Sequence, residues 1–340
     1  MKRQGTFPFT AIIGQEEMKK ALVLNVVNPK LGGVLITGEK GTAKSTAVRA
    51  LADLLPPRLC IKGCRFHDDP NDKSNWCDEC HEKYDNALPE TEELPMKVVE
   101  LPVSATEDRV VGTLDIEAAI KEGKRSFETG ILADANRNIL YVDEINLLDD
   151  HVVDVLLDSA AMGINTVERE GISYSHPARF SLVGTMNPEE GDIRPQLLDR
   201  FALSVYVAGE KDLDKRAEVI KRRLEYEDDP EGFIKKWDEE QQNEVHRIQR
   251  AMKLLPQVTT SNEILRMAAQ ISITLGVDGH RADIVLIKTA ETLAAVAGHT
   301  EVTKEDLREA AHLALPHRMR RRPFEEQKLD WENVDKVIDG

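Results

Sequence analysis

The sequence predicts an α/β fold with a parallel sheet, followed by a smaller all-helical domain, and three observations lead to this prediction. Short apolar runs alternate with stretches of helical spacing such as 150–162. A Gly-rich turn joins the first apolar run to a helix, and the strand signal ends after about residue 211. Strands that alternate with helices are typical of a parallel sheet covered on both faces. The five candidate strands are 33–37, 96–103, 138–144, 179–187 and 202–207.

Length and composition limit the class of protein. With 340 residues and 41% hydrophobic content the chain can bury a sizeable core, and its length favours two domains. The opening MKRQGTFPFT lacks an apolar run, and nowhere do about 18 uncharged apolar residues occur together. We therefore expect a cytoplasmic protein with no membrane contact. The net charge of −16 argues against a nucleic-acid partner, and the basic run HRMRRR at 317–322 is interpreted as a solvated helix end.

Two segments interrupt the alternation of strands and helices. Residues 104–131 and 164–178 each have the pattern of a hairpin, the second turning at Glu170-Gly171, and we interpret both as inserts on the sheet. The predicted domains are 1–210, which includes a Cys-bearing loop at 58–95, and 211–340.

The C-terminal third has helical patterns throughout. The acidic stretch 225–233 contains Pro and Gly, as a linker or inter-helix loop would. Thr260 or Ser261 is the expected cap of the second helix that follows, and Thr303 with Asp306 is the expected capping box of the last. The expected helices are 238–255, 260–275, 281–297 and 303–314.

The stretch Gly38-Glu39-Lys40-Gly41-Thr42-Ala43-Lys44-Ser45, followed by Thr46, predicts a P-loop, because a strand precedes it and a helix follows. Glycines let backbone N–H groups surround phosphates at a helix N-terminus. Lys44 would place its charge on the β and γ oxygens, and Ser45 would offer a hydroxyl to Mg²⁺. Ala43 stands where a second glycine is usual. We expect it to be tolerated on a near-helical backbone, since only a positive φ would demand glycine.

Polar residues at the ends of later strands supply the rest of a nucleotide site. Asp143 and Glu144 end an apolar strand, so Asp143 would hold Mg²⁺ through water and Glu144 would polarise the attacking water. Asn187 could orient that water, or Asn187-Pro188 could simply start a turn. Arg200 is either half of a surface salt bridge with Asp199 or an arginine finger.

All four cysteines lie in the loop after the P-loop helix, in a C-x3-C and a C-x2-C pair. Cys60, Cys64, Cys77 and Cys80 could close a tetrahedral zinc site, with His67 and His81 as spare ligands. An Fe–S cluster, a redox switch or free thiols are the alternatives, because a disulfide is not expected to persist in a reducing cytoplasm. We interpret the loop as a polar surface excursion away from the phosphates.

Long phrases of the chain, among them LYVDEINLLDDHVVDVLLD, VEREGISYSHPARFSLVGTMNPEEGDIRPQLLDRF and VDGHRADIV, closely resemble the ATPase subunit I of magnesium chelatase. The resemblance runs from the FPFT phrase to LPHRMRRRPF. It implies an AAA+ fold of the MoxR and chelatase clade, with a five-stranded sheet domain and a helical lid, assembled into a ring that is expected to be a hexamer. The two hairpins would be the helix-2 and pre-sensor-1 inserts.

The resemblance also implies roles for single residues. Gly38 to Ser45 match Walker A, and Asp143 with Glu144 match Walker B. Asn187 matches sensor 1. Arg200 falls at the arginine finger, which acts on ATP in a neighbouring subunit, and Arg281 matches sensor 2. The adenine-side box would be formed by Ile13, Gly14 and Gln15.

The function implied by the resemblance is ATP hydrolysis within a complex. A larger AAA+ subunit with an integrin-like domain and a large porphyrin-binding catalytic subunit would be the partners, and the complex would insert Mg²⁺ into protoporphyrin IX. The same motor could instead serve a cobalt chelatase for corrinoids. A MoxR-like chaperone is disfavoured by VEREGISYSHPARF, and a zinc-organised scaffold without ATPase activity by the intact Lys44, Asp143, Glu144 and Arg200.

Overall fold

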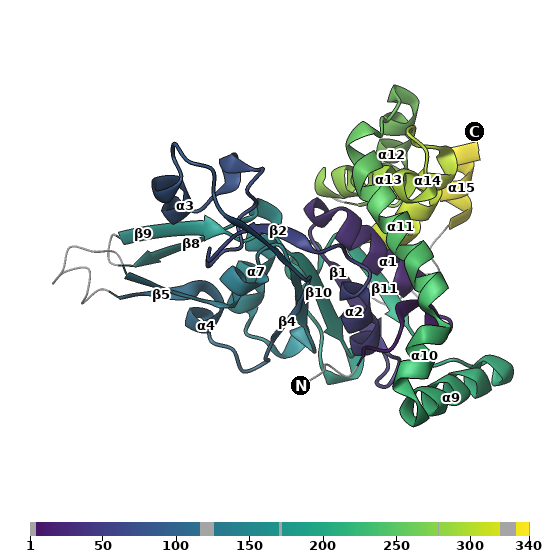
Figure 1. The fold of residues 1–340 in the computed structure, drawn as a ribbon. Coiled ribbons are helices and arrows are strands. Elements are labelled where there is room, and N and C mark those ends of the chain that lie inside the picture. The colour runs from purple at the N-terminus through teal and green to yellow at the C-terminus, as the bar shows by residue number, and fades with distance from the viewer. Residues whose placement is uncertain (1–4, 116–125, 170–171, 278, 320–330, 340) are drawn as a thin grey trace.

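A computed structural model describes residues 5–115, 126–169, 172–277, 279–319 and 331–339 (Figure 1). Its centre is a five-stranded parallel sheet in the order β11-β1-β10-β7-β4. Each strand lies on one of the five predicted apolar runs, so the predicted α/β class is confirmed. The strands are β1 (Val34–Gly38), β4 (Val98–Leu101), β7 (Ile139–Val142), β10 (Ser181–Met186) and β11 (Leu203–Val207).

The central strands are buried throughout because helices cover both faces of the sheet. Every residue of β7 and β10 is buried. Alternate residues of β1 enter different cores: Val34 and Ile36 pack against the lid side, and Leu35 packs on the opposite side. The helices of the sheet domain are α1 (Glu16–Val27), α2 (Lys44–Ala52), α3 (Asp78–Lys83), α4 (Glu107–Val111), α6 (Ile131–Ala135), α7 (Asp150–Met162) and α8 (Pro195–Leu198).

Both predicted inserts contain antiparallel hairpins. The first pairs β5 (Gly112–Asp115) with β6 (Ser126–Thr129), and the second pairs β8 (Ile164–Arg169) with β9 (Ile172–Pro177). The first insert also contains the short helix α4 before its hairpin. The turn predicted at 170–171 lies outside the described residues. In Figure 1 both hairpins extend from the same end of the molecule, on the side away from the helical domain.

The helical domain follows the predicted pattern from α11 onward. The predicted loop at 225–233 is wrong: α9 continues to Asp228, α10 begins at Pro230, and only Asp229 separates them. Asp229 accepts a hydrogen bond from the Gly232 backbone N–H, so Asp at the N-cap and Pro at the first position start a helix here. The helices are α9 (Leu213–Asp228), α10 (Pro230–Lys236), α11 (Asp238–Leu254), α12 (Asn262–Thr274), α13 (Arg281–Ala297), α14 (Lys304–Ala314) and α15 (Trp331–Asp339).

The predicted helix caps are also present. Ser261 accepts a hydrogen bond from the backbone N–H of Ile264, and Thr303 with Asp306 forms a capping box. No helix in the described part of the chain is long and apolar enough to cross a membrane. The last strand of the sheet ends at Val207 and the first helix of the C-terminal domain begins at Leu213.

The basic run at 317–322 is not a solvated helix end where the structure describes it. Arg318 is buried, and its guanidinium donates to the carbonyl oxygens of Phe201, Ala202 and Asp199 at 2.6, 2.9 and 2.9 Å. Burial lowers the pKa of the neighbouring His317 to about 3, and the Arg318 charge adds to that effect. Buried carbonyl groups need a hydrogen-bond donor, and Arg318 supplies one to the three carbonyls of the turn before β11. This side chain therefore joins the helical domain to that turn.

Candidate nucleotide site

The predicted P-loop connects β1 to α2. β1 ends at Gly38, where a Cβ atom would lie 1.9 Å from the carbonyl oxygen of Val207 on the neighbouring β11. No side chain fits there, so glycine is required where the loop leaves the sheet. α2 begins at Lys44, and its first backbone N–H groups are free to bind an anion.

Ala43 differs from the sequence expectation. Its backbone is left-handed, with φ +62° and ψ +18°, and not near-helical. A side chain in this region costs about 1 kcal/mol relative to glycine. The loop therefore keeps the conformation that a glycine would adopt, and the alanine is held in it under strain.

A cavity of about 480 Å³ opens over the P-loop. It brings together residues that are distant in the sequence, including the predicted Ile13 and Gln15 and the C-terminal half of the P-loop. Gly14 lies between these two with a positive φ, and the Gln15 side chain donates to the Ala208 carbonyl at 2.8 Å. The P-loop residues that line the cavity are Gly41, Thr42, Ala43, Lys44, Ser45 and Thr46.

Hydrogen bonds and an ion pair of Glu39, Lys40 and Lys44 hold the P-loop in place. Lys44 Nζ donates to the carbonyl oxygens of Gly38 and Glu39 at 2.7 and 3.1 Å, and burial lowers the pKa of this amine. The Glu39 carboxylate accepts from the Gly209 N–H at 3.1 Å, and Lys40 forms an ion pair with Glu190. The Lys44 amine is thus already positioned inside the loop, where phosphate oxygens could replace its carbonyl partners.

Ser45 and Asp143 are joined through a third residue. The Tyr141 hydroxyl lies 2.9 Å from Ser45 Oγ and donates to Asp143 Oδ1 at 2.9 Å. Thr185 Oγ1 donates to the same carboxylate oxygen at 2.5 Å. Burial raises the pKa of Tyr141 to about 12, so its hydroxyl stays protonated and remains a donor. The two predicted Mg²⁺ ligands therefore belong to one hydrogen-bonded group.

Glu144 follows directly, in a left-handed backbone conformation with φ +54°. Its N–H donates to Thr185 Oγ1 at 3.1 Å, and its carboxylate lies 3.9 Å from Lys40 Nζ. Burial raises the pKa of Glu144, and the negative charge of Glu190 raises it further. The Glu144 carboxylate thus lies near Lys40 of the P-loop and is carried on a strained backbone.

The other three predicted residues, like Asp143 and Glu144, are not among the residues that line the cavity. Asn187 caps a short turn, with its Oδ1 accepting from the Glu189 N–H at 3.2 Å, as the turn interpretation expected. Arg200 pairs with Asp154 and Asp158 of α7 at 2.8 and 2.7 Å, and not with Asp199.

Asp199 instead pairs with Arg281 and Arg318, at 3.2 and 3.3 Å. Asp199 lies next to Arg200 in the chain, Arg281 begins α13 of the helical domain, and Arg318 follows α14. Two ion pairs therefore join the segment carrying Arg200 to the helical domain.

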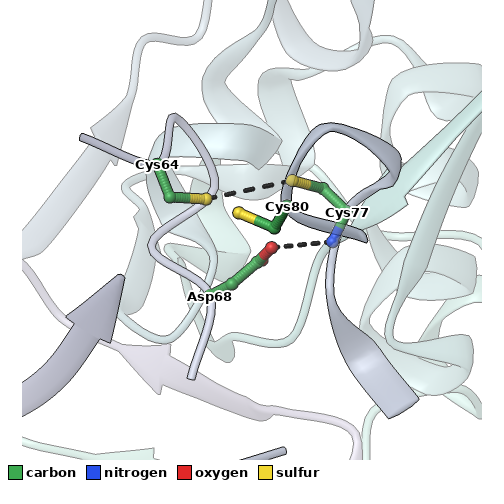
Figure 2. A group of neighbouring side chains, drawn as sticks. All are labelled: Cys64, Asp68, Cys77 and Cys80. Atoms are coloured by element: carbon green, nitrogen blue, oxygen red, sulfur yellow. Dashed lines mark hydrogen bonds between the residues drawn. The ribbon is translucent and has the colours of Figure 1, made fainter. Parts of the chain in front are cut away.

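The cysteine segment is folded around a small core of its own. Phe66 and Trp76 are buried in it together with Ile61, so it is not merely a polar excursion. Figure 2 shows Cys64, Cys77 and Cys80 converging with Asp68.

Cys60, predicted as a fourth ligand, does not join this group. It lies on β2 (Arg58–Ile61), which pairs with β3 (Thr91–Leu94), and its sulfur is within 3.6 Å of the Arg58 carbonyl and of the Arg137 side chain. The predicted spare ligands also lie outside the group. His67 has a buried Nδ1 without a hydrogen-bond partner in the described structure, and the His81 ring packs on Trp76.

The sequence interpretation missed four residues of these two sites. Tyr141, Thr185 and Glu190 complete the surroundings of Asp143 and Glu144, and Asp68 completes the cysteine group. Their only sequence signal is position: Tyr141 stands two residues before Asp143, Thr185 stands two residues before Asn187, and Asp68 follows a cysteine by four residues.

A P-loop between β1 and an α-helix, an Asp-Glu pair directly after β7 of the same parallel sheet, and a helical domain that packs on the sheet domain define an ATPase of the AAA class. Family models agree: residues 84–201 match the AAA domain of the dynein-related subfamily, and residues 265–338 match the AAA lid domain. Within that class the chain belongs to the family of magnesium-chelatase subunit I.

Two curated relatives show this. The magnesium-chelatase subunit ChlI homolog of Methanocaldococcus jannaschii is 58% identical over 99% of this chain and 92% of its own length. The magnesium-chelatase subunit ChlI of a Nostoc species is 51% identical over 99% of this chain and 90% of its own. A complex of the magnesium-chelatase subunits BchI and BchD, based on a single-particle cryo-EM reconstruction, contains a chain that is 45% identical, with a TM-score of 0.56 over 98% of this chain and 99% of that one.

Proposed function

We propose that this chain is the ATP-hydrolysing motor subunit of a magnesium chelatase and that its turnover drives insertion of Mg²⁺ into protoporphyrin IX. The observation that carries the proposal is the hydrogen-bonded group that links Ser45 to Asp143 beside Lys44 and the cavity. The names of the curated relatives favour magnesium over the cobalt and chaperone alternatives.

The donor set fits MgATP. A hydroxyl at Ser45 and a carboxylate at Asp143 are the oxygen ligands that Mg²⁺ prefers, and a helix N-terminus beside the half-buried Lys44 suits phosphates. Bound Mg²⁺ would neutralise charge that develops on the phosphates. Gln15 and Ile13 would contact the base side of the cavity, and Arg281 would serve as sensor 2.

Glu144 would polarise the attacking water, for which it must be ionised. Asn187 would hold that water from the end of β10, as sensor 1. Ser45 would remain a ligand, and the Tyr141 hydroxyl would keep the Asp143 carboxylate oriented. The chain's own contribution is thus binding, orientation and one proton acceptor.

Assembly into a ring, expected to be a hexamer, would complete the site. Arg200 would serve as an arginine finger for a neighbouring subunit; within its own chain it pairs with Asp154 and Asp158 of α7. α9 leaves Leu213, Ile220 and Leu224 exposed, as a helix that packs on another subunit would. A larger AAA+ subunit with an integrin-like domain and a porphyrin-binding subunit would be the partners, in the cytoplasm.

One further cofactor is proposed. A structural Zn²⁺ ion in the cysteine segment is supported by three thiols that converge there.

Glu144→Gln tests the proposal. The variant should lose MgATP hydrolysis by about 100-fold or more, while its ATP affinity stays within about threefold of the original. Turnover is measured by phosphate release and binding by titration with a fluorescent ATP analogue. Glu263→Gln, an exposed glutamate in the first turn of α12, is the matched control and should leave both unchanged.

Unchanged hydrolysis in Glu144→Gln would contradict the assignment. The metal is then tested by reconstitution with the partner subunits, protoporphyrin IX and either Mg²⁺ or Co²⁺. ATP-dependent formation of the cobalt product alone would overturn the magnesium assignment.

A further inference from the structure

The thiols of Cys64, Cys77 and Cys80 and a carboxylate oxygen of Asp68 all lie within 4.8 Å of one another. We refer to these four residues as the cysteine–aspartate cluster. Cys64 and Asp68 come from the turn after β2, and Cys77 and Cys80 come from the start of α3 (Figure 2). The cluster therefore joins two separate pieces of the segment.

Asp68 provides the first argument for a bound cation. It is only 1% exposed, and its Oδ2 accepts a hydrogen bond from the Cys77 N–H at 2.7 Å. Its Oδ1 is buried and has no hydrogen-bond partner among the residues that the structure describes. A buried carboxylate oxygen with no donor is strongly disfavoured unless a cation neutralises it. The hydrogen bond to Oδ2 fixes the orientation of the carboxylate, as outer partners of metal ligands do.

The spacing of the sulfurs provides the second argument. Cys64 Sγ and Cys77 Sγ are 3.9 Å apart. Two thiolates on one tetrahedral zinc, each about 2.3 Å from the metal, are separated by about 3.8 Å. A disulfide requires about 2.05 Å, and the cysteines are free thiols in this structure. An Fe–S cluster spreads its thiolates over two or more irons, whereas these four ligand atoms all lie within 4.8 Å of one another, as close as ligands of one ion.

Three of the four residues, Asp68, Cys77 and Cys80, are buried. Without a metal, the cluster would be a largely buried set of thiols around an uncompensated carboxylate.

We infer that Cys64, Asp68, Cys77 and Cys80 together hold one structural Zn²⁺ ion, and that this ion braces the segment against the two inserted hairpins. The inference specifies the ligands of the zinc proposed above and rests on that proposal, but it does not depend on ATP turnover. Cys60 takes no part in it, and a carboxylate replaces the fourth thiolate that the cysteine spacing suggested.

The contacts of the turn between Cys64 and Asp68 indicate what the ion stabilises. The Phe66 ring stacks on His176 of β9 with centroids 4.7 Å apart. The Arg65 side chain donates to the Phe127 carbonyl of β6 at 3.1 Å. The Phe66 carbonyl accepts from Asn136, which follows α6, at 2.5 Å. One turn thus contacts both hairpins and the sheet domain, while the P-loop lies elsewhere.

Metal content of the full-length chain, purified without chelator, tests the ligand set. The original protein should contain about one zinc per chain, and Cys77→Ser and Cys64→Ser should contain less than about 0.2. Cys60→Ser is the matched control, since it removes a buried thiol of the same segment, and it should keep its zinc. Equal loss in Cys60→Ser, or iron with a visible chromophore in place of zinc, would overturn the ligand set.

Cobalt substitution keeps the test decisive if a cysteine variant fails to fold. Co²⁺ in the original chain should give a tetrahedral spectrum with a thiolate charge-transfer band, and Cys64→Ser should lower that band by about a third, because one of three thiolates is lost. Asp68→Asn should retain the band and bind Co²⁺ at least about tenfold more weakly. An unchanged affinity would exclude Asp68 as a ligand.

Hydrogen exchange tests the brace. Removal of zinc by a chelator should speed amide exchange in residues 58–94 and in β8 and β9, with no change in α2 or α13. Equally faster amide exchange throughout the chain, or unchanged exchange in β8 and β9, would contradict the inference that the ion braces the segment against the hairpins. ATPase failure alone would leave these readouts unaffected, so the two proposals can be distinguished.

Discussion

Thr185, near the end of β10, donates a 2.5 Å hydrogen bond to Asp143 Oδ1 beyond the end of β7. The same hydroxyl oxygen accepts from the Glu144 backbone N–H at 3.1 Å. One buried side chain therefore positions both acidic residues of the proposed site. The Thr185 O–H group orients the Asp143 carboxylate, and the Thr185 oxygen accepts the hydrogen bond that holds the strained backbone of Glu144.

Thr185→Val keeps the shape of the side chain and removes both hydrogen bonds. We expect kcat/KM for MgATP to fall by about 10-fold to 100-fold, because outer partners of metal ligands contribute effects of that size. The Mg²⁺ concentration that gives half the maximal rate should rise, since the Asp143 carboxylate is no longer oriented. Steady-state kinetics at several Mg²⁺ concentrations measure both effects.

Two variants separate positioning from stability. Thr185→Ser restores the hydroxyl and should recover most of the rate. Thr289→Val removes a buried hydroxyl that bonds Val285 within α13, remote from the acids, and should leave the kinetics unchanged. Equal rates in the original chain and Thr185→Val would rule out the positioning role.

Glu190 influences the pH dependence through Glu144. Burial, and then the Glu190 charge, raise the pKa of Glu144. Glu144 must be ionised to accept a proton, so activity should rise with pH through its pKa. Glu190→Gln removes a negative neighbour and leaves Lys40 to pair with Glu144 alone, and both changes lower that pKa. The acid limb should therefore move to lower pH.

The measurement is the pH profile of kcat for the original chain and Glu190→Gln, with Glu263→Gln as the control. A limb that stays in place, or moves to higher pH, would show that Glu190 does not act on the proton acceptor. Because Glu190 also pairs with Lys40, kcat at the plateau is compared separately from the position of the limb.

Ala43 is predicted to store strain in the P-loop. Its φ of +62° suits glycine, so Ala43→Gly should raise the free energy of unfolding by about 0.5 to 1 kcal/mol. Urea unfolding monitored on the sheet domain measures the change. Ala50→Gly, in the middle of α2, is the matched control and should lower stability by about 1 kcal/mol or more. Destabilisation by both glycines would contradict the strain.

Particular residues show what the sequence could predict. The five strands were recognisable because buried parallel strands are continuous apolar runs, as Ile139–Val142 is. The continuation of α9 through Glu225 could not be recognised from the sequence, because the acidic and Pro residues there have the composition of a loop. Only the capping of α10 by Asp229 explains why Pro230 begins a helix.

The sites were harder to predict because they depend on strand pairing. Thr185 is an ordinary strand threonine until β10 lies beside β7, with Gly184 opposite Val142. Likewise, spacing alone placed Cys60 in the zinc set, but β2 extends through Ile61 and directs that thiol toward Arg137. Asp68 enters the cluster only through the turn that follows. The kinds of residue at both sites could therefore be predicted from the sequence, but which side chains contact one another could not.

Complementation between two inactive variants tests whether Arg200 acts on a neighbouring chain. Arg200→Ala chains retain Glu144, and Glu144→Gln chains retain Arg200. If Arg200 acts in trans, random mixing should give about a quarter of the sites both groups, and about a quarter of the original activity. Arg281→Ala mixed with Glu144→Gln is the control: Arg281 is predicted to act on its own chain's ATP, so no site regains both groups. Mass measurement verifies that mixed assemblies form. If the first mixture then recovers no activity, Arg200 does not act in the neighbour's site. Its role would then be the ion pairs with Asp154 and Asp158.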